Sequence, residues 1–303
     1  MSSNPRPGPD RRLRMNRAYA IIPLEDGVQL RAGDEEIVFL EVADVESAAA
    51  LLSGWAAEET IERPTDALGQ ALFDALLDEA ILVSGQPMGS SDLEDYLSHA
   101  PQVDGARLAS ARAELWVQDE CGQLEDLLRE AIQAHGVEVN LTHSPSPNSA
   151  GDDALTVALA AWERPDYHRV RQWNAEAVRR RQPCLFVDLS HGRHATLGPF
   201  FIPAEGACYE CFRTRQRENS ESLDELEAAE ELMLRNEEAL PGYGVLPAHR
   251  YWLVGLAVGE LLSFWSRHRP LRTCNRAVTV DFETLRTWSE PVWRIPWCER
   301  CRQ

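Results

Sequence analysis

The chain has 303 residues, enough for two domains, and 44% of them are hydrophobic, as in ordinary globular proteins. Its formal net charge at pH 7 is -19, which repels a phosphate backbone and argues against nucleic acid as a partner. No apolar run approaches the length of a membrane helix and no secretory signal is visible, so we expect a cytoplasmic protein without a membrane partner.

The amino-terminal third predicts three strands followed by helices. Residues 1–17 are rich in Pro, Ser and Arg, and we expect a disordered tail there. Residues 18–85 then form a first domain, with predicted strands at 19–24, 28–31 and 36–42. Two amphipathic helices follow, and a short strand closes the domain at 81–83. The helices are capped by Asp44 and Thr65, and the second carries Leu68, Leu72, Phe73 and Leu76.

This order of elements predicts a winged-helix domain, a fold that often binds DNA. The second helix argues against that role, because it carries no Lys or Arg and its charged residues are Asp66, Asp74, Asp78 and Glu79. A zinc-stabilised transcription regulator is therefore disfavoured. A purely structural cap stays open as a role for this domain.

A second domain of α/β class is predicted at 105–303, after a linker at 86–104 rich in Ser, Gly and Pro. It begins with a strand, a helix and a strand at 113–117, 123–135 and 137–141, a βαβ unit that implies a parallel, Rossmann-type sheet. Further strands are predicted at 154–160, 184–189, 197–201, 277–281 and 284–288. Further helices are predicted at 167–181, 218–238 and 247–265.

The turn after the first strand of this βαβ unit is unsuited to a nucleotide. Nucleotide-binding units have a glycine-rich turn there, which lets backbone amides approach the phosphates. Here the turn reads Gln118-Asp119-Glu120-Cys121-Gly122, with one glycine and two carboxylates. Repulsion between these carboxylates and a triphosphate is on the order of several kcal/mol in a partly buried site. We therefore expect no ATP to be bound. At the end of a later strand, Asp188 is expected to cap a loop rather than to act in catalysis.

Two Cys-x-x-Cys pairs, Cys208 with Cys211 and Cys298 with Cys301, predict a metal site that ties the end of the chain to its middle. Two such pairs supply the four thiolates of a tetrahedral zinc shell, and four protein ligands leave no open position for catalysis. We therefore expect a structural zinc. Two disulfides or four free thiols are the alternatives. Trp293 and Trp297 flank the second pair and are expected to shield the ion.

The residues around the first pair resemble a known family. They read Gly198-Pro199, then Pro203-x-x-Gly206-x-Cys208-x-x-Cys211-x-x-x-Arg215. This string is similar to one in the ThiF-like proteins of thiazole/oxazole and thiopeptide-type ribosomal-peptide biosynthesis, relatives of adenylating enzymes that work beside YcaO-type cyclodehydratases. The resemblance covers about residues 105–303. The order of elements in the first domain resembles the PqqD-like recognition element that binds leader peptides in these pathways.

The resemblance implies a non-catalytic scaffold that binds the leader of a precursor peptide and presents it to a YcaO-type enzyme. It places the strand at 36–42 on a sheet edge beside the second helix. The implied peptide-binding residues are Glu36, Ile37, Val38, Phe39, Leu40, Leu68, Leu72, Phe73 and Leu76. An active adenylating enzyme of the ThiF class is the alternative function. A second copy of the chain is a further candidate partner.

Overall fold

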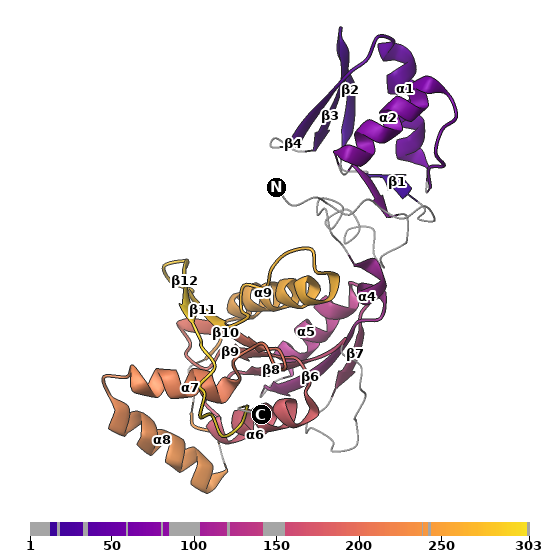
Figure 1. Ribbon diagram of the computed structural model, residues 1–303. Helices are drawn as coiled ribbons and strands as arrows, with labels where there is room; N and C mark the ends of the chain where they lie inside the picture. The colour runs from indigo at the N-terminus through magenta and orange to yellow at the C-terminus, as the bar shows by residue number, and fades with distance from the viewer. Residues whose placement is uncertain are drawn as a thin grey trace. The chain divides into compact units, whose positions relative to one another are not determined.

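The computed structural model describes residues 13–16, 19–32, 36–58, 60–79, 81–84, 104–119, 122–141, 155–237, 239–241 and 244–301. The chain divides into two compact units, Met1–Gly105 and Ala106–Gln303 (Figure 1). Apart from Asp104, the predicted linker at 86–104 lies outside the described residues.

The amino-terminal unit contains a three-stranded antiparallel sheet in the order β2-β3-β4, so that β4 lies at an edge. The sheet has the three predicted strands, β2 (Ala20–Pro23), β3 (Gly27–Ala32) and β4 (Glu36–Glu41). Helices α1 (Val45–Ala57) and α2 (Ala67–Asp78) follow in the predicted order. The winged-helix assignment itself stays a prediction.

A second, two-stranded sheet in this unit corrects the expected tail. Residues Leu13–Met15 form β1, which pairs antiparallel with β5 (Leu82–Ser84). The chain before β1, residues 1–12, lies outside the described residues. Met15 is 1% exposed, because β1 brings its side chain into the hydrophobic core of the unit. The prediction of a disordered tail is therefore wrong for Leu13–Met15.

Both helices of this unit begin at a carboxylate cap. The Asp44 side chain accepts a hydrogen bond from the backbone N–H of Ser47 at 3.0 Å, as predicted for α1. The predicted Thr65 cap of α2 is wrong by one residue, since Asp66 accepts the bond from Gly69 at 2.7 Å. A carboxylate accepts from the first-turn amides more strongly than a hydroxyl does.

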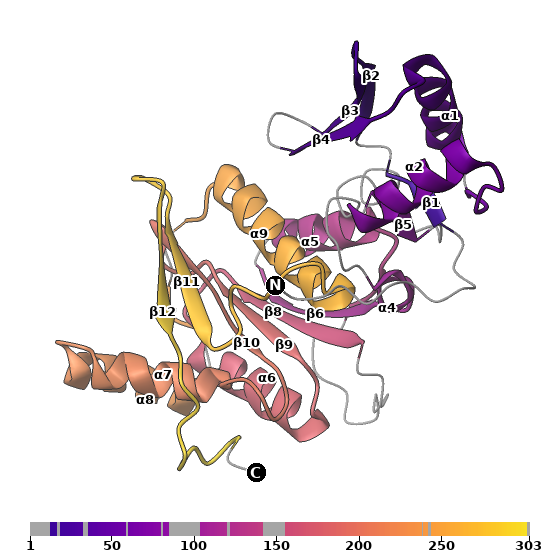
Figure 2. The same ribbon diagram turned by 45° about the horizontal axis from the view of Figure 1, so that its top comes forward.

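The carboxy-terminal unit is built on a seven-stranded mixed sheet in the order β12-β11-β10-β9-β8-β6-β7 (Figure 2). Strands β7, β6, β8 and β9 are parallel, as the βαβ pattern predicted, and β10, β11 and β12 are antiparallel. Their bounds are β6 Arg112–Gln118, β7 Glu138–Leu141, β8 Thr156–Trp162, β9 Cys184–Asp188, β10 His194–Phe201, β11 Arg276–Asp281 and β12 Arg286–Pro291.

Helices cover both faces of this sheet (Figures 1 and 2). Helices α5 (Gln123–Gln133) and α9 (Pro247–Ser266) pack together on one face, near the short α4 (Gly105–Ala109). The other face carries α6 (Tyr167–Arg180), α7 (Tyr209–Glu218) and α8 (Leu223–Asn236). The single helix predicted at 218–238 is therefore α8, which begins later, and α7 precedes it. No helix within the described ranges has the length and apolarity needed to cross a membrane.

Candidate functional site

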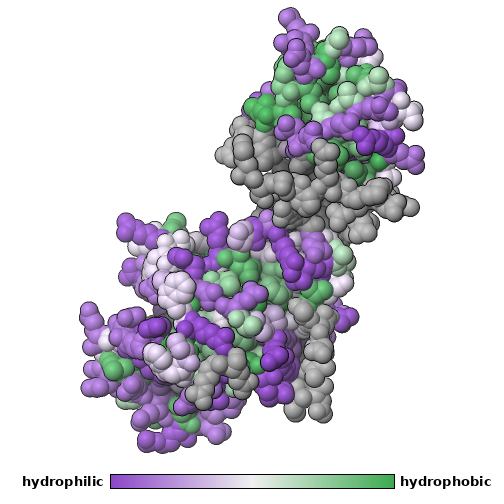
Figure 3. Space-filling view, in the orientation of Figure 1, coloured by the Kyte–Doolittle hydropathy of each residue, from purple (hydrophilic) through white to green (hydrophobic). Residues whose placement is uncertain are grey.

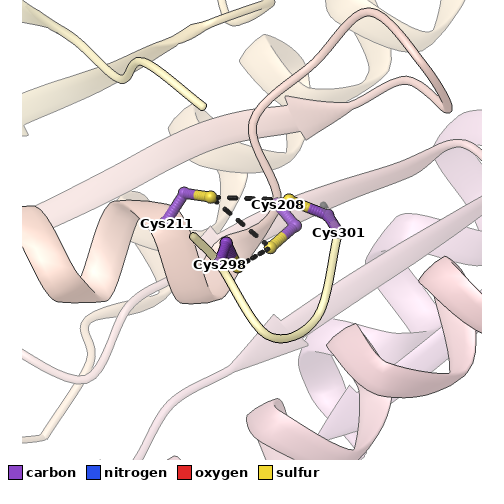
Figure 4. A group of neighbouring side chains, drawn as sticks. All are labelled: Cys208, Cys211, Cys298 and Cys301. Atoms are coloured by element: carbon purple, nitrogen blue, oxygen red, sulfur yellow. Dashed lines mark hydrogen bonds between the residues drawn. The ribbon is translucent and has the colours of Figure 1, made fainter. Parts of the chain in front are cut away.

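The four cysteines of the two Cys-x-x-Cys pairs meet in the carboxy-terminal unit (Figure 4). The Sγ of Cys208 lies 3.9 Å from that of Cys211 and 3.8 Å from that of Cys298. The Sγ atoms of Cys211 and Cys301 are 3.5 Å apart, and all four lie within 4.8 Å of one another. Ligand sulfurs at about 2.3 Å from a tetrahedral ion are about 3.8 Å apart. The cluster therefore has the dimensions of a four-thiolate metal site.

The sulfurs are buried and are not joined as disulfides. A disulfide would need sulfurs about 2 Å apart. Hydrogen bonds with the other cluster thiols, Cys211 first, raise the pKa of Cys208. The Cys208 thiol, and then the amides of Cys301 and Arg300, lower the pKa of Cys298 to about 6. A bound divalent cation would deprotonate the remaining thiols.

Helix α7 positions the first pair. Cys208 is its N-cap and Cys211 lies in its first turn, where unpaired amides and the helix dipole favour a thiolate. The buried Asn174 side chain accepts a hydrogen bond from the Tyr209 N–H at 2.9 Å and holds this turn in place. The N–H of Ile295, from the other side of the cluster, donates to Cys211 Sγ at 3.4 Å.

Asn275 joins the two halves of the cluster. Its side-chain oxygen accepts a hydrogen bond from Ala207 N–H at 3.0 Å, just before the first pair. Its backbone carbonyl accepts one from Val292 N–H at 2.8 Å, on the segment that leads to the second pair. The Arg294 guanidinium donates to the Cys301 carbonyl. Sequence reasoning missed Asn275, since it lies outside both motifs.

The two tryptophans near the second pair do not shield the cluster. Trp293 and Trp297 are each 66% exposed, so the prediction that they cover the ion is wrong. Burial comes from residues packed in the same core, Tyr209, Phe212, Val292 and Ile295. These side chains belong to α7 and to the segment after β12.

At the carboxyl end of β6, a carboxylate is hydrogen-bonded to the first turn of the helix that follows. Asp119 accepts hydrogen bonds from the backbone amides of Leu124, at 2.5 Å, and Glu125, at 3.4 Å. These are first-turn amides of α5, the groups that bind phosphate in dinucleotide sites. Gly122 has φ +70°, the left-handed conformation that glycine adopts without strain. Glu120 and Cys121 of the same turn lie outside the described residues.

Asp119→Ala is expected to lower the free energy of unfolding by about 1 kcal/mol, as the loss of a helix cap does. The reason is that two first-turn amides of α5 lose their acceptor. Urea unfolding of both proteins measures the difference. Asp119→Asn keeps an acceptor oxygen and is expected to lose less. Equal stability of the alanine variant and the wild type would contradict the cap.

A buried ion pair lies at the same edge of the sheet. Glu163, which follows β8, accepts two hydrogen bonds from Arg250 on α9, at 2.5 and 2.8 Å. Both residues are 8% exposed, and Arg250 also donates to the Gln123 side chain of α5 at 3.0 Å. The pair thus ties α5 and α9 to the strand end. Sequence reasoning missed it, because its members are more than eighty residues apart.

Asp188 caps its own loop. Its carboxylate accepts hydrogen bonds from the Ser190 N–H at 2.8 Å and the Ser190 hydroxyl at 2.6 Å. The predicted capping role is confirmed by these contacts. A hydrogen bond from His191 to the same carboxylate raises the pKa of His191. No nucleophile is hydrogen-bonded to His191 among the described residues.

The predicted peptide-binding residues fall into two groups in the structure. On β4, Ile37 and Phe39 are 48% and 46% exposed on the outer face, whereas Leu40 is buried and Val38 is half-buried. Figure 3 shows hydrophobic side chains at the surface of the amino-terminal unit. The side chain of Glu36 lies outside the described residues.

The helix residues of that prediction lie mostly in the core. Leu72, Phe73 and Leu76 are 2%, 5% and 0% exposed, and only Leu68 is half-buried. The first three therefore offer no surface to a peptide, which corrects the prediction that they line a groove. Among the described residues β4 pairs with β3 alone, so its other edge and its exposed side chains remain for a peptide.

No protein-family model and no curated protein matches the chain. Solved structures do match, among them structures of heterocyclases. The structure of the heterocyclase TruD has a TM-score of 0.71 at 18% identity, over 96% of this chain and 43% of that chain. A heterocyclase in complex with substrate and cofactor has a TM-score of 0.70 at 17% identity, over 96% and 39%. E. coli MccB with succinimide has a TM-score of 0.57 at 13% identity, over 96% and 99%.

The chain has the fold of these proteins. That similarity supports the α/β fold expected from the sequence for the second domain. The chain spans less than half of the length of the heterocyclases and nearly all of MccB.

Proposed function

We propose that this chain binds the leader region of a ribosomally made precursor peptide and presents it to a separate YcaO-type cyclodehydratase. The observation that carries the proposal is the edge of β4, which has no partner strand within the described ranges and carries the exposed Ile37 and Phe39. The fold similarity to heterocyclases, one of them solved with its substrate, supports peptide modification as the setting.

An extended peptide can add a strand to β4. Backbone hydrogen bonds would supply part of the affinity, and alternate side chains would contact the two faces of the sheet. About four ladder bonds at a net ~1 kcal/mol each fall short of the roughly 8 kcal/mol of micromolar binding. Apolar leader side chains must supply the rest, at roughly 1.5–3 kcal/mol each. These leader side chains would contact Ile37 and Phe39 on one face of the sheet and Val38 on the other.

The chain is proposed to be a scaffold without nucleotide chemistry. The Asp119 carboxylate already satisfies the α5 amides that would bind a phosphate. The Glu163–Arg250 ion pair lies at the same strand ends. Displacing Glu163 would leave the buried Arg250 charge unpaired, and displacing Asp119 would cost two α5 amides their acceptor, so neither group is readily available to a nucleotide. A YcaO-type partner would then carry the ATP-dependent step.

The alternative function is ATP-dependent adenylation by this chain. One observation favours it: E. coli MccB has also been solved with ATP, and its TM-score with this chain is 0.57. The two proposals differ at Asp119, because an adenylating site requires the α5 amides for phosphate.

The cysteine cluster is proposed to hold a structural zinc. The four ligands are soft thiolates at tetrahedral spacing, which suits zinc, and no ligand position is left for water. Cys208, Cys211, Cys298 and Cys301 would hold the ion. Bound there, zinc would tether the chain end to α7 and supply no chemistry to a substrate.

Calorimetry with two ligands tests the proposed function. The leader of the precursor encoded in the same gene cluster is expected to bind the purified chain with micromolar affinity, whereas Mg-ATP is expected to give no heat of binding. Micromolar binding of Mg-ATP would support the adenylating alternative. Absence of leader binding by a folded, metal-loaded chain would contradict the scaffold proposal.

A further inference from the structure

The seven-stranded sheet ends on an edge strand, β12, whose side chains are exposed. Within the described part of the chain, β12 pairs with β11 alone, and each of its six residues is exposed. It lies at the edge of the sheet in Figures 1 and 2. An open strand edge is a template for pairing with another chain unless it is blocked.

Backbone N–H and C=O groups along β12 point alternately toward β11 and toward the open edge. Val292 N–H donates to the carbonyl of Asn275, its partner across the ladder. Hydrogen-bonded pairs alternate along antiparallel strands, so Glu290, Trp288 and Arg286 bond to β11. Thr287 and Ser289 then direct their N–H and C=O groups outward. Pro291 lies in the same outward phase and has no N–H to present, which is where proline is tolerated in a sheet.

The sequence of β12 is complementary to itself in the antiparallel direction. When Trp288 lies on a two-fold axis, Thr287 of one copy faces Ser289 of the other. Both residues direct their backbone groups outward, so the two strands can exchange four hydrogen bonds. In the same register, Arg286 faces Glu290 of the second copy on one sheet face, at cross-strand distance. Opposite charges meet at both ends of the pair.

We propose that β12 is the interface of a two-fold dimer, in which two copies of this chain pair their edge strands into one continuous sheet. A two-fold axis makes each contact occur twice, as closed dimers require.

Exposed aromatic residues around the strand fit this interface. Trp288 is 41% exposed on β12, Leu285 in the preceding turn is 69% exposed, and Trp293 and Trp297 after the strand are 66% exposed. Tryptophan is enriched in protein interfaces and is rarely left exposed in such number on a monomer. The cysteine cluster holds the segment that carries Trp293 and Trp297.

Charge exchange tests this assignment. Wild-type protein is expected to sediment as a dimer at micromolar concentration. Arg286→Glu places like charges opposite each other twice, and Glu290→Arg does the same. Each is expected to raise the dimer dissociation constant at least tenfold. The double variant Arg286→Glu/Glu290→Arg restores both pairs and is expected to recover the wild-type constant. Thr287→Pro removes an outward N–H and is expected to weaken the dimer while β12 stays paired with β11.

Glu231→Arg on α8 is the matched control, a reversal of an exposed charge away from β12 that is expected to leave the dimer intact. Circular dichroism and thermal unfolding confirm that every variant is folded. A monomeric wild type at concentrations up to the millimolar range would overturn the proposal. So would a dimer that is insensitive to these substitutions, or a double variant that fails to recover association.

Discussion

Cys298→Ser is expected to remove the bound metal and to leave much of the protein insoluble. Cys298 is one of four cysteines whose sulfurs lie within 4.8 Å of one another, and its loss opens the tetrahedral shell. Structural zinc contributes on the order of 10 kcal/mol to folding, which is comparable to the whole stability of a domain. Elemental analysis of wild-type protein is expected to find about one zinc per chain, and the variant is expected to have lost it.

Cys274→Ser is the matched control, because Cys274 is half-buried and lies outside the cluster. This variant is expected to retain zinc and solubility. Wild-type protein that is folded and monodisperse but contains no zinc would contradict the metal assignment. Zinc that persists in Cys298→Ser at the wild-type ratio would show that the ion is bound elsewhere.

Phe39→Glu is expected to weaken leader binding at least tenfold while the amino-terminal unit stays folded. Phe39 is 46% exposed on the edge strand, so the substitution removes an apolar contact for the leader without opening the core. A buried side chain of this size contributes roughly 1.5–3 kcal/mol, and tenfold corresponds to about 1.4 kcal/mol. Fluorescence anisotropy with a labelled leader measures the affinity, and thermal unfolding measures the fold.

Two further variants separate binding from folding. Ile22→Glu changes a half-buried apolar residue in the same cross-strand row as Phe39, but on the far edge strand β2, and is expected to leave affinity unchanged. Leu72→Glu places a carboxylate in the core at a 2% exposed position and is expected to unfold the unit, at a cost of at least about 3 kcal/mol. Full leader affinity in a chain that lacks residues 1–104 would show that the binding site lies in the other unit.

Local signals predicted most elements of this chain. Strand β4 shows as a run of β-branched and aromatic residues, and α1 as a capped amphipathic pattern, because both depend on neighbouring residues. Helix α7 was missed because it begins within a cysteine motif that was interpreted as a turn. Strand β1 was missed because it is short, and its pairing with β5 is decided nearly seventy residues later in the chain.

The cysteine spacing by itself determined which four residues could share one metal ion. Two Cys-x-x-Cys pairs whose thiols stay reduced are typical of a metal site. The acidic turn at Asp119 likewise predicted the loss of a phosphate site. Only the tertiary structure decided that Asp119 satisfies the α5 amides itself, that Asn275 clamps the cluster, and that Leu72 is core rather than surface. Burial and long-range hydrogen bonds depend on which distant segments pack together, and local sequence patterns do not specify that packing.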